Sequence, residues 1–426
     1  MSKSINRYIE LQGGFAFKSS DFIESGIPLI RISNITKDGL NKTDAKLLPI
    51  EYQSELKEYL VLENDTLIAM SGATTGKSCI VKKGDLPCLI NQRVGRFKII
   101  NEQEIDKTFV FYVVNSSEFQ NELLKDAVGG AQPNVSPKQI EKISWDFPLY
   151  NKQRKIAQIL STADTVIEKT QTAIAKYKAI KQGMLHDLFT RGIDVKTGKL
   201  RPKYGDAPDL YKESKLGWIP KEWEEKPLQE FTTQIGDGIH STPKYSSNTD
   251  FHFINGNNLS KGEILIGAAL CVDEDEYKKH FKELNTRTIL YSINGTIGNI
   301  AIYNNQKVIL GKSACYITCK PSVNLEYIFF ILQSFQISKF YELEMTGSTI
   351  SNLSLTSIRN TPILIPQDAK EQLLISERIN SVNNKLKSEQ TYLQKLQMLK
   401  SGLMNELLSG KKLVSVPNEL ETETTY

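Results

Sequence analysis

The feature of this sequence that most constrains its fold is an internal repeat, in which each copy is about half as long as the chain. Residues 180–189 (IKQGMLHDLF) align without a gap with residues 399–408 (LKSGLMNELL), an offset of 219 positions (399 − 180). Toward the N-terminus, weaker similarity joins residues 65–76 to 287–298. A repeat of this length predicts two similar units, each with its own hydrophobic core.

Each unit is expected to contain a globular α+β domain followed by a long helix. The helical stretches of the two copies are more alike than their domains. This predicts that the helices serve a shared structural role and that the divergent domains can recognise different targets. A Gly- and Pro-rich stretch between the copies predicts irregular chain. The expected boundaries are a first domain at 1–150, a first helix at 151–192, a linker at 193–225, a second domain at 226–367, a second helix at 368–410 and a disordered tail at 411–426.

Both helical stretches carry apolar residues at heptad spacing, and polar residues interrupt the two patterns at matching positions. The apolar positions are Ile156, Leu160, Ala163, Ile167, Ile174 and Tyr177 in the first helix, and Ile375, Ile379, Val382, Leu386, Leu393 and Leu396 in the second. Matched seams predict that the helices pair as an antiparallel coiled coil, which would relate the units by a pseudo-twofold axis. The alternative is that each helix packs only on its own domain.

Net charge alone does not indicate a nucleic-acid binder, because 53 Lys and Arg residues stand against 49 Asp and Glu residues. Local clusters are more informative. Between Ser71 and Lys98 six basic residues accompany one acidic residue, and such a patch can neutralise phosphates. The equivalent stretch of the second copy also holds several Asn and Gln side chains, which can pair with base edges.

These clusters yield a set of candidate DNA contacts. The alternative is a basic surface whose acidic partners come from elsewhere in the fold. The candidates are Arg31, Asn34, Lys77, Lys82, Arg93, Arg96 and Lys98 in the first copy, and Asn257, Asn258, Asn299, Lys307 and Lys312 in the second.

The sequence gives little sign of catalysis, of a metal site or of a cofactor. The segment Gly72–Ser78 resembles a phosphate-binding loop, but it is one residue too short, and the second copy lacks its Lys and Ser. A turn between two strands is the better interpretation. The acidic run at 273–276 is interpreted as a solvated charge run rather than a cation site.

Cysteine and hydropathy patterns bear on the compartment. Five cysteines without CxxC spacing and four scattered histidines predict free thiols and no metal site. The sequence contains neither an apolar leader nor a run of apolar residues long enough to cross a bilayer. We therefore expect a cytoplasmic protein without membrane association.

The order of these elements resembles the specificity subunit of type I restriction-modification systems over essentially the whole chain. The residues that carry the likeness are 148–160 (PLYNKQRKIAQIL), 181–188, 188–192 (LFTRG), 216–223 (LGWIPKEW) and 400–407. One departure is that no counterpart of residues 217–223 precedes the first domain.

The resemblance implies a division of labour. Each domain would act as a target-recognition domain that recognises one half of a bipartite site in double-stranded DNA. The helices would bind two DNA adenine methyltransferase subunits, and restriction/translocase subunits would join them. Two alternatives remain: a stand-alone bipartite-site DNA-binding regulator, and an enzyme with a nucleotide site at Gly72–Ser78.

Overall fold

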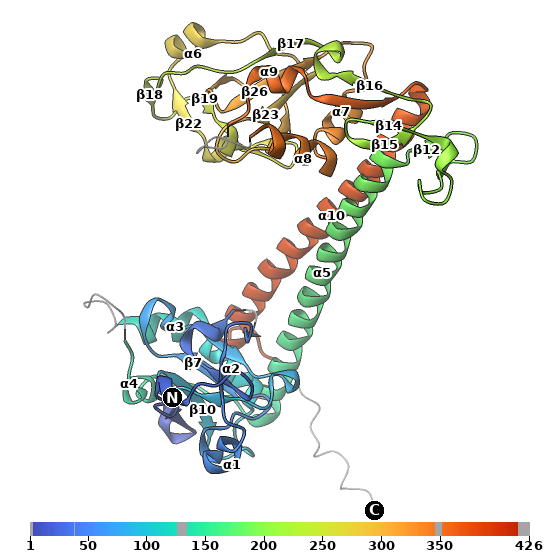
Figure 1. Ribbon diagram of the computed structural model, residues 1–426. Helices are drawn as coiled ribbons and strands as arrows, with labels where there is room; N and C mark the ends of the chain where they lie inside the picture. Colours follow the sequence, from blue (N-terminus) through green and yellow to red (C-terminus); the bar gives the residue numbers. More distant parts are fainter. Residues whose placement is uncertain (1–2, 38, 126–133, 346–351, 416–426) are drawn as a thin grey trace, which may run out of the picture. The chain divides into compact units, whose positions relative to one another are not determined.

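The computed structural model describes residues 3–37, 39–125, 134–345 and 352–415, and the chain divides into two compact units. Unit 1 comprises residues 1–171 and 391–426, and unit 2 comprises residues 172–390. Figure 1 labels the elements of both units. The two predicted long helices are confirmed, and each begins in one unit and ends in the other: α5 is Tyr150–Thr190 and α10 is Ala369–Leu408.

A four-stranded antiparallel sheet forms the centre of unit 1. Its strands, in spatial order, are β2 (Ile9–Gly13), β10 (Val94–Ile99), β7 (Thr66–Ala69) and β8 (Ser78–Ile80). Successive side chains of a strand point to opposite faces. In β7, Ile68 packs toward the core that contains helix α2 (Lys107–Val114), whereas Leu67 packs toward a second, smaller sheet. Both faces of the central sheet are therefore covered.

The smaller sheet of unit 1 has three strands and a parallel pair. Its order is β6 (Lys46–Leu48), β3 (Ile27–Ile30) and β9 (Leu89–Ile90). The other elements are β1 (Lys3–Ser4), β4 (Ile35–Thr36), β5 (Gly39–Leu40), α1 (Tyr52–Glu55), α3 (Ser117–Lys125), α4 (Pro137–Glu141) and β11 (Ser144–Trp145).

Unit 2 repeats this architecture. Its central sheet has the order β17 (Thr232–Gly236), β26 (Ala314–Cys319), β23 (Thr288–Ser292) and β24 (Ile300–Ile302). Its second sheet has the order β18 (Tyr245–Ser246), β22 (Leu270–Val272), β19 (Phe251–Ile254) and β25 (Val308–Leu310), with β19 and β25 parallel.

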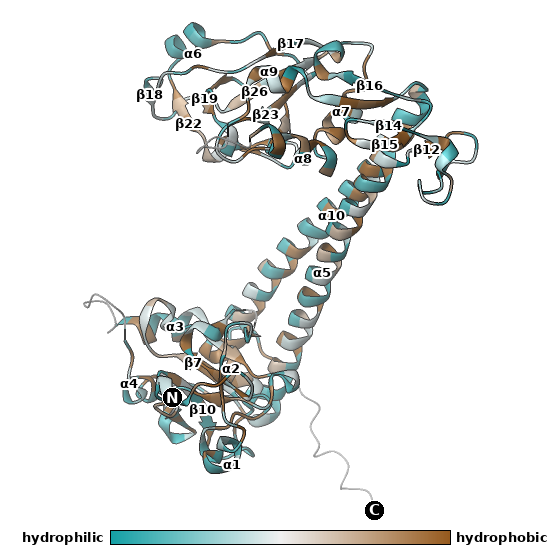
Figure 2. Cartoon of the chain, viewed as in Figure 1, coloured by the Kyte–Doolittle hydropathy of each residue, from teal (hydrophilic) through white to brown (hydrophobic). Residues whose placement is uncertain are grey.

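The equivalence of the units confirms the predicted tandem α+β fold. The helices of unit 2 are α6 (Glu274–His280), α7 (Leu325–Ile331), α8 (Phe335–Glu344) and α9 (Leu355–Arg359), and a short hairpin joins β20 (Leu259–Ser260) to β21 (Glu263–Ile264). Figure 2 shows apolar residues gathered on the central strands, while the long helices carry polar and apolar residues along their length.

Residues 193–225 are more ordered than the irregular chain that we predicted. They contain the hairpins β12 (Ile193–Asp194) with β13 (Lys199–Leu200) and β14 (Tyr211–Ser214) with β15 (Gly217–Pro220). Strand β16 (Trp223–Pro227) then pairs with β27 (Pro362–Pro366). Glycine and proline set the corners of these hairpins but did not reveal their long-range partner.

One buried carboxylate ties this segment to the start of α10. Glu371 is 2% exposed and accepts hydrogen bonds from the Ile193 backbone N–H at 2.7 Å and from Trp223 Nε1 at 3.2 Å. The guanidinium of Arg201 donates to both carboxylate oxygens of Glu371. A buried charge needs such partners, so Trp223 and Arg201 fix the segment against the helix.

Within unit 1, the first half of α5 packs against the last half of α10. Ile156 and Leu160 share a core with Leu407 and Leu408. One turn further along α5, Asp164 forms an ion pair with Lys400. Residue numbers thus rise on α5 as they fall on α10, and the helices are antiparallel in this unit.

Within unit 2, the second half of α5 packs against the first half of α10 in the same sense. Leu188 shares a core with Ile375, and Lys385 Nζ lies 6.0 Å from the ring centroid of Tyr177. Every apolar seam position that we predicted is buried or half-buried, and the exposed positions of the helices lie between them. The seam is therefore the face on which the helices meet.

Two equivalent seam lysines differ in their partners. Lys400 pairs with Asp164, which also accepts a 2.7 Å hydrogen bond from Tyr112 Oη. Asn383 occupies the position equivalent to Asp164 (164 + 219), and no ion pair of Lys181 is found in the described part of the chain. Burial lowers the pKa of Lys181, because a desolvated ammonium favours its neutral form.

In the described part of the chain, no helix combines the length and the apolar character needed to cross a membrane. Of the predicted tail at 411–426, residues 411–415 are described and form no helix or strand, and residues 416–426 lie outside the described residues.

Replacing Lys181 by Leu is expected to raise stability by about 1 kcal/mol, since an unpaired, half-buried charge is removed from an apolar seam. Lys400→Leu is the matched control, and it should give no gain, because it leaves Asp164 without its cation. The pKa of Lys181 is lower in the folded state, so wild-type stability should rise as pH increases through that pKa. Calorimetric melting at pH 7 and pH 10 measures the difference in stability between Lys181→Leu and the wild type. This difference should be smaller at pH 10. A difference independent of pH would contradict this account.

Candidate nucleic-acid interface

Three turns come together at one edge of unit 1. They are residues 31–34, which follow β3, residues 71–77 between β7 and β8, and residues 91–93 between β9 and β10. The Met70 backbone N–H donates to the Arg93 carbonyl at 3.0 Å, and the Asn91 N–H donates to the Ile30 carbonyl at 2.9 Å. Thr74 Oγ1 donates to the Ile32 carbonyl at 3.5 Å. We call these three turns the unit 1 loop edge.

The unit 1 loop edge is cationic. Lys77 and Arg93 are exposed, and Arg31 is partly exposed. Arg31 Nη2 donates to the Asp44 carbonyl at 3.4 Å, while its Nε is buried without a hydrogen-bond partner in the described part of the chain. No ion pair of these three side chains is found among the described residues. Their charge is therefore available to an anion such as a DNA phosphate, and both arginines can also recognise guanine.

Unit 2 presents the equivalent loop edge, made of residues 255–258, 293–299 and 311–313. Its turns are bound more tightly to one another, since the Gly256 N–H donates to Ser313 Oγ at 2.9 Å and Asn299 Nδ2 donates to the Gly256 carbonyl at 3.0 Å. Asn257 and Lys312 are exposed at this edge. The unit 2 loop edge thus offers one amide and one ammonium where unit 1 offers cations.

Two of the predicted DNA contacts belong to the framework instead. Asn34 and Asn258 are buried, and each accepts a hydrogen bond from the backbone three residues earlier, Arg31 N–H at 2.9 Å and Asn255 N–H at 3.0 Å. Each asparagine closes its own turn, and neither amide is accessible to a base. Asn299 is half-exposed and donates one hydrogen bond from Nδ2 to the Gly256 carbonyl, so it stays a predicted contact.

Arg96 is likewise a structural residue rather than a DNA contact. It is 8% exposed and forms an ion pair with Asp65 at 3.5 Å. Its guanidinium also donates to Gln12 Oε1 and to the carbonyls of Glu58 and Leu60. The acidic partner, Asp65, lies in the turn just before β7, about thirty residues ahead of Arg96, so the basic cluster in the sequence overstated the surface charge.

The remaining predicted cations lie away from the loop edges. Lys82 pairs with Glu168 at 3.1 Å, and Lys98 lies 3.9 Å from Glu10. Lys307 Nζ lies 5.2 Å from the ring centroid of Phe251. All three are exposed, but each lies at the end of a strand away from the loop-edge turns, since Lys82 follows β8, Lys98 is near the end of β10 and Lys307 precedes β25.

The Gly72–Ser78 segment does not have the geometry of a nucleotide-binding loop. Strands β7 and β8 pair antiparallel on either side of it, and no α-helix follows the turn. A phosphate-binding loop places its backbone N–H groups at a helix N-terminus. The interpretation as a turn between strands is therefore confirmed.

The candidate chemistry elsewhere is structural. Burial raises the pKa of Cys79 and of Cys88 to about 12, so neither thiol is a nucleophile near neutral pH. Asp273 caps α6 by accepting from the Glu276 N–H at 2.7 Å. Among the described residues, no group of three or more His, Cys, Asp and Glu side chains is placed to hold a metal ion.

Sequence reasoning missed some residues of the loop edges. Ser33 and Gln92 are exposed on the unit 1 loop edge, beside Arg31 and Arg93, and Ser313 lies on the unit 2 loop edge. The available signal was position, because each residue lies in a short turn between two buried strands. Clusters of charged residues gave no indication of these uncharged side chains.

Comparison with known proteins follows the same division into two halves. The family model described as the type I restriction modification DNA specificity domain matches residues 3–177 and again residues 220–398. The type I restriction enzyme MjaVIII specificity subunit of Methanocaldococcus jannaschii is 24% identical over 413 residues, which cover 94% of this chain and 87% of that protein. The EcoAI specificity subunit of Escherichia coli is 33% identical over 176 residues, which cover 41% of this chain and 29% of that protein.

Two solved structures share the fold. The crystal structure of a type I restriction-modification S subunit from M. genitalium has a TM-score of 0.58 at 14% identity and covers 96% of both chains. A structure from a study of assembly and conformational transition of the type I system has a TM-score of 0.55 at 14% identity, covering 96% of this chain and 97% of that one. Since the family model matches most of the sequence, in two copies, the chain belongs to the type I restriction-modification DNA specificity family.

Proposed function

We propose that each loop edge contacts one half of a bipartite site in double-stranded DNA. Membership of the family makes the chain the non-catalytic, DNA-recognising subunit of a type I restriction-modification system. The observation that supports the finer proposal is the convergence of Arg31, Lys77 and Arg93 on one edge of unit 1, with an equivalent edge in unit 2. Different side chains on equivalent edges suit two different half-sites.

We further propose the partners of this subunit. Two DNA adenine methyltransferase subunits would bind the paired helices, and restriction/translocase subunits would join that complex. The exposed faces of α5 and α10 support this proposal, because the seam occupies only one side of each helix. The proposed compartment is the cytoplasm. The stand-alone regulator gains no support from the relatives, which are named as restriction enzyme subunits.

The loop edges can be tested by paired substitutions in the complex with methyltransferase. Arg93→Ala should weaken binding to the cognate duplex by about tenfold and relax base preference in one half-site, since a good bidentate base contact is worth about 1–3 kcal/mol. Lys312→Ala should affect the other half-site. Fluorescence anisotropy with duplexes altered in either half measures both effects.

Lys98→Ala is the matched control, because Lys98 is exposed on the same strand as Arg96 but lies away from the loop edge. Its affinity should stay close to that of the wild type. Equal losses of DNA affinity in Lys98→Ala and Arg93→Ala would contradict the proposal that the unit 1 loop edge contacts DNA. Mapping methylated adenines in a host that carries the system supplies the cognate sequence.

The partner proposal predicts a defined stoichiometry. Co-expression with the methyltransferase subunit should give a stable complex with one copy of this chain and two of the partner, and native mass spectrometry measures the ratio. A chain that binds its DNA site tightly but never retains two methyltransferase subunits would favour the stand-alone regulator instead.

The continuous helices suggest that their length sets the gap between half-sites. A heptad inserted in both α5 and α10 adds about 10 Å at 1.5 Å per residue, which is close to three base pairs. The gap should lengthen accordingly, while the bases of each half-site stay the same. Methylation mapping in the host provides the measurement, and an unchanged gap would contradict the proposal.

A further inference from the structure

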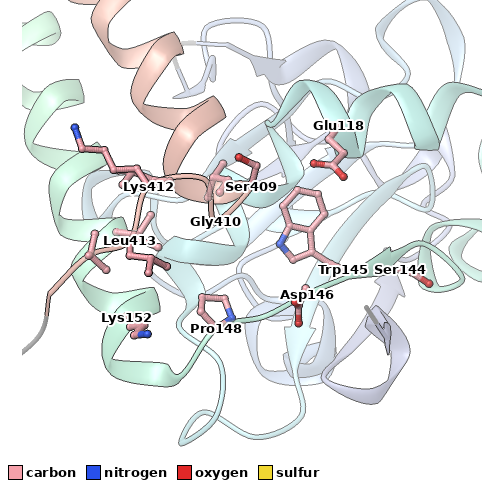
Figure 3. A pocket seen from close by; sticks show the side chains of 14 residues that line it. Glu118, Ser144, Trp145, Asp146, Pro148, Lys152, Ser409, Gly410, Lys412 and Leu413 are labelled. Atoms are coloured by element: carbon pink, nitrogen blue, oxygen red, sulfur yellow. The ribbon is translucent and has the colours of Figure 1, made fainter. Parts of the chain in front are cut away.

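A cavity opens in unit 1 between the end of α10 and the start of α5. Its volume is about 330 Å³, and its apolar lining includes Trp145, Pro148, Ile156, Leu407, Leu408 and Leu413. Figure 3 shows these elements around it, with the nitrogen edge of the Trp145 indole turned toward the Gly410–Leu413 segment. The proposed DNA contacts do not line this cavity.

The equivalent place in unit 2 is filled by the chain itself. Gly192 and Gly410 both follow a long helix and have positive φ values, +65° and +72°. A Cβ atom added to Gly192 would lie 2.6 Å from the Trp223 ring and 2.2 Å from Glu371 Oε1. A Cβ atom added to Gly410 would meet nothing within 4 Å among the described residues. Trp223 thus occupies in unit 2 the space that is open in unit 1.

The two places also differ in charge. Gln153 donates to the Pro148 carbonyl at 2.8 Å, as Gln372 does to the Pro366 carbonyl at 3.0 Å, which fixes the register of the first helical turns. In this register Lys152 is the equivalent of Glu371 (152 + 219). Where unit 2 places a carboxylate that accepts hydrogen bonds, unit 1 places an ammonium.

A second donor at the cavity, Trp145 Nε1, has no partner among the residues that the structure describes. Trp145 is 6% exposed, and its Nε1 is buried without a hydrogen bond to any described residue. A buried N–H group without an acceptor costs about 1–3 kcal/mol, so an incoming acceptor would be favoured here. The carboxylates of Glu118 and Asp146 lie on the other side of the cavity from Lys152 and Lys412 in Figure 3.

We propose that this cavity binds a segment of a partner polypeptide in which a bulky apolar side chain stands beside an acidic residue. The apolar side chain enters the cavity, as Trp223 does in unit 2. The acidic side chain lies toward Lys152, for which no ion pair is found in the described part of the chain. The carboxylates on the other side of the cavity orient the segment by repelling its acidic end.

The test uses the full-length protein and three short peptides. Two peptides contain a fluorinated phenylalanine, and the third contains alanine at that position. One has Phe flanked by two Glu residues, the second has Phe flanked by two Lys residues, and the third has Ala in place of Phe between the Glu residues. The acidic Phe peptide should bind about fivefold more tightly than the basic one, which corresponds to about 1 kcal/mol. The Ala peptide should not bind. Fluorine NMR and, for the Ala peptide, proton NMR titrations measure each affinity.

Charge reversal makes the test specific. Lys152→Glu should reverse the preference to the basic peptide, whereas Lys155→Glu, on the exposed side of the same helical turn, should leave it unchanged. Thermal melting checks that both variants fold. Equal binding of all three peptides, no binding at millimolar concentration, or a preference unaffected by Lys152→Glu would overturn the proposal. DNA binding is measured separately, so failure here leaves the loop-edge proposal standing.

Discussion

The rest of the structure depends on the apolar seam between α5 and α10. Each unit includes half of α5 and half of α10 in its own core, so the core of neither unit is complete without both helices. In unit 1, Leu407 and Leu408 complete a core that begins with Ile5 and Ile9. Burial of a leucine side chain is worth about 1.5–3 kcal/mol, so these two residues alone supply a substantial part of a domain's usual stability.

The repeat separates what is kept from what is varied. Both units keep the strand order, the parallel pair in the second sheet and the asparagine that closes the first turn of the loop edge. The loop edges differ, with Arg31, Lys77 and Arg93 in one and Asn257 and Lys312 in the other. A framework held by buried backbone pairing tolerates such changes, because turn side chains contribute little to the core.

Much of the fold could be predicted from the sequence, because periodicity is a local property that is visible in one chain. The heptads located both helices, and the second copy correctly excluded a phosphate-binding loop at Gly72. Residues 193–225 were misjudged, since Trp223 and Glu371 are partners about 150 positions apart. Pairing at that distance leaves no local pattern.

The candidate site was only partly predictable for the same reason. Composition located a basic cluster, but it could not distinguish Arg93 from Arg96, three positions later. Arg93 is exposed in a turn, whereas Arg96 is buried against Asp65. Alternation along a strand places neighbouring positions on different faces, and which face is covered depends on the tertiary fold. The uncharged residues Ser33 and Gln92 escaped notice because only their place in the fold marks them.

The division of the helices between units has a consequence for synthesis on the ribosome. Unit 2 is continuous from residue 172 to residue 390, so all of it has been made before the last segment of unit 1 is translated. Unit 1 needs residues 391–408 to close its core, although its first residues are made earliest. Domains generally fold from the N-terminus during synthesis. Here the first domain to emerge is the last to be completed, and a truncated chain would expose its unfinished core to quality control.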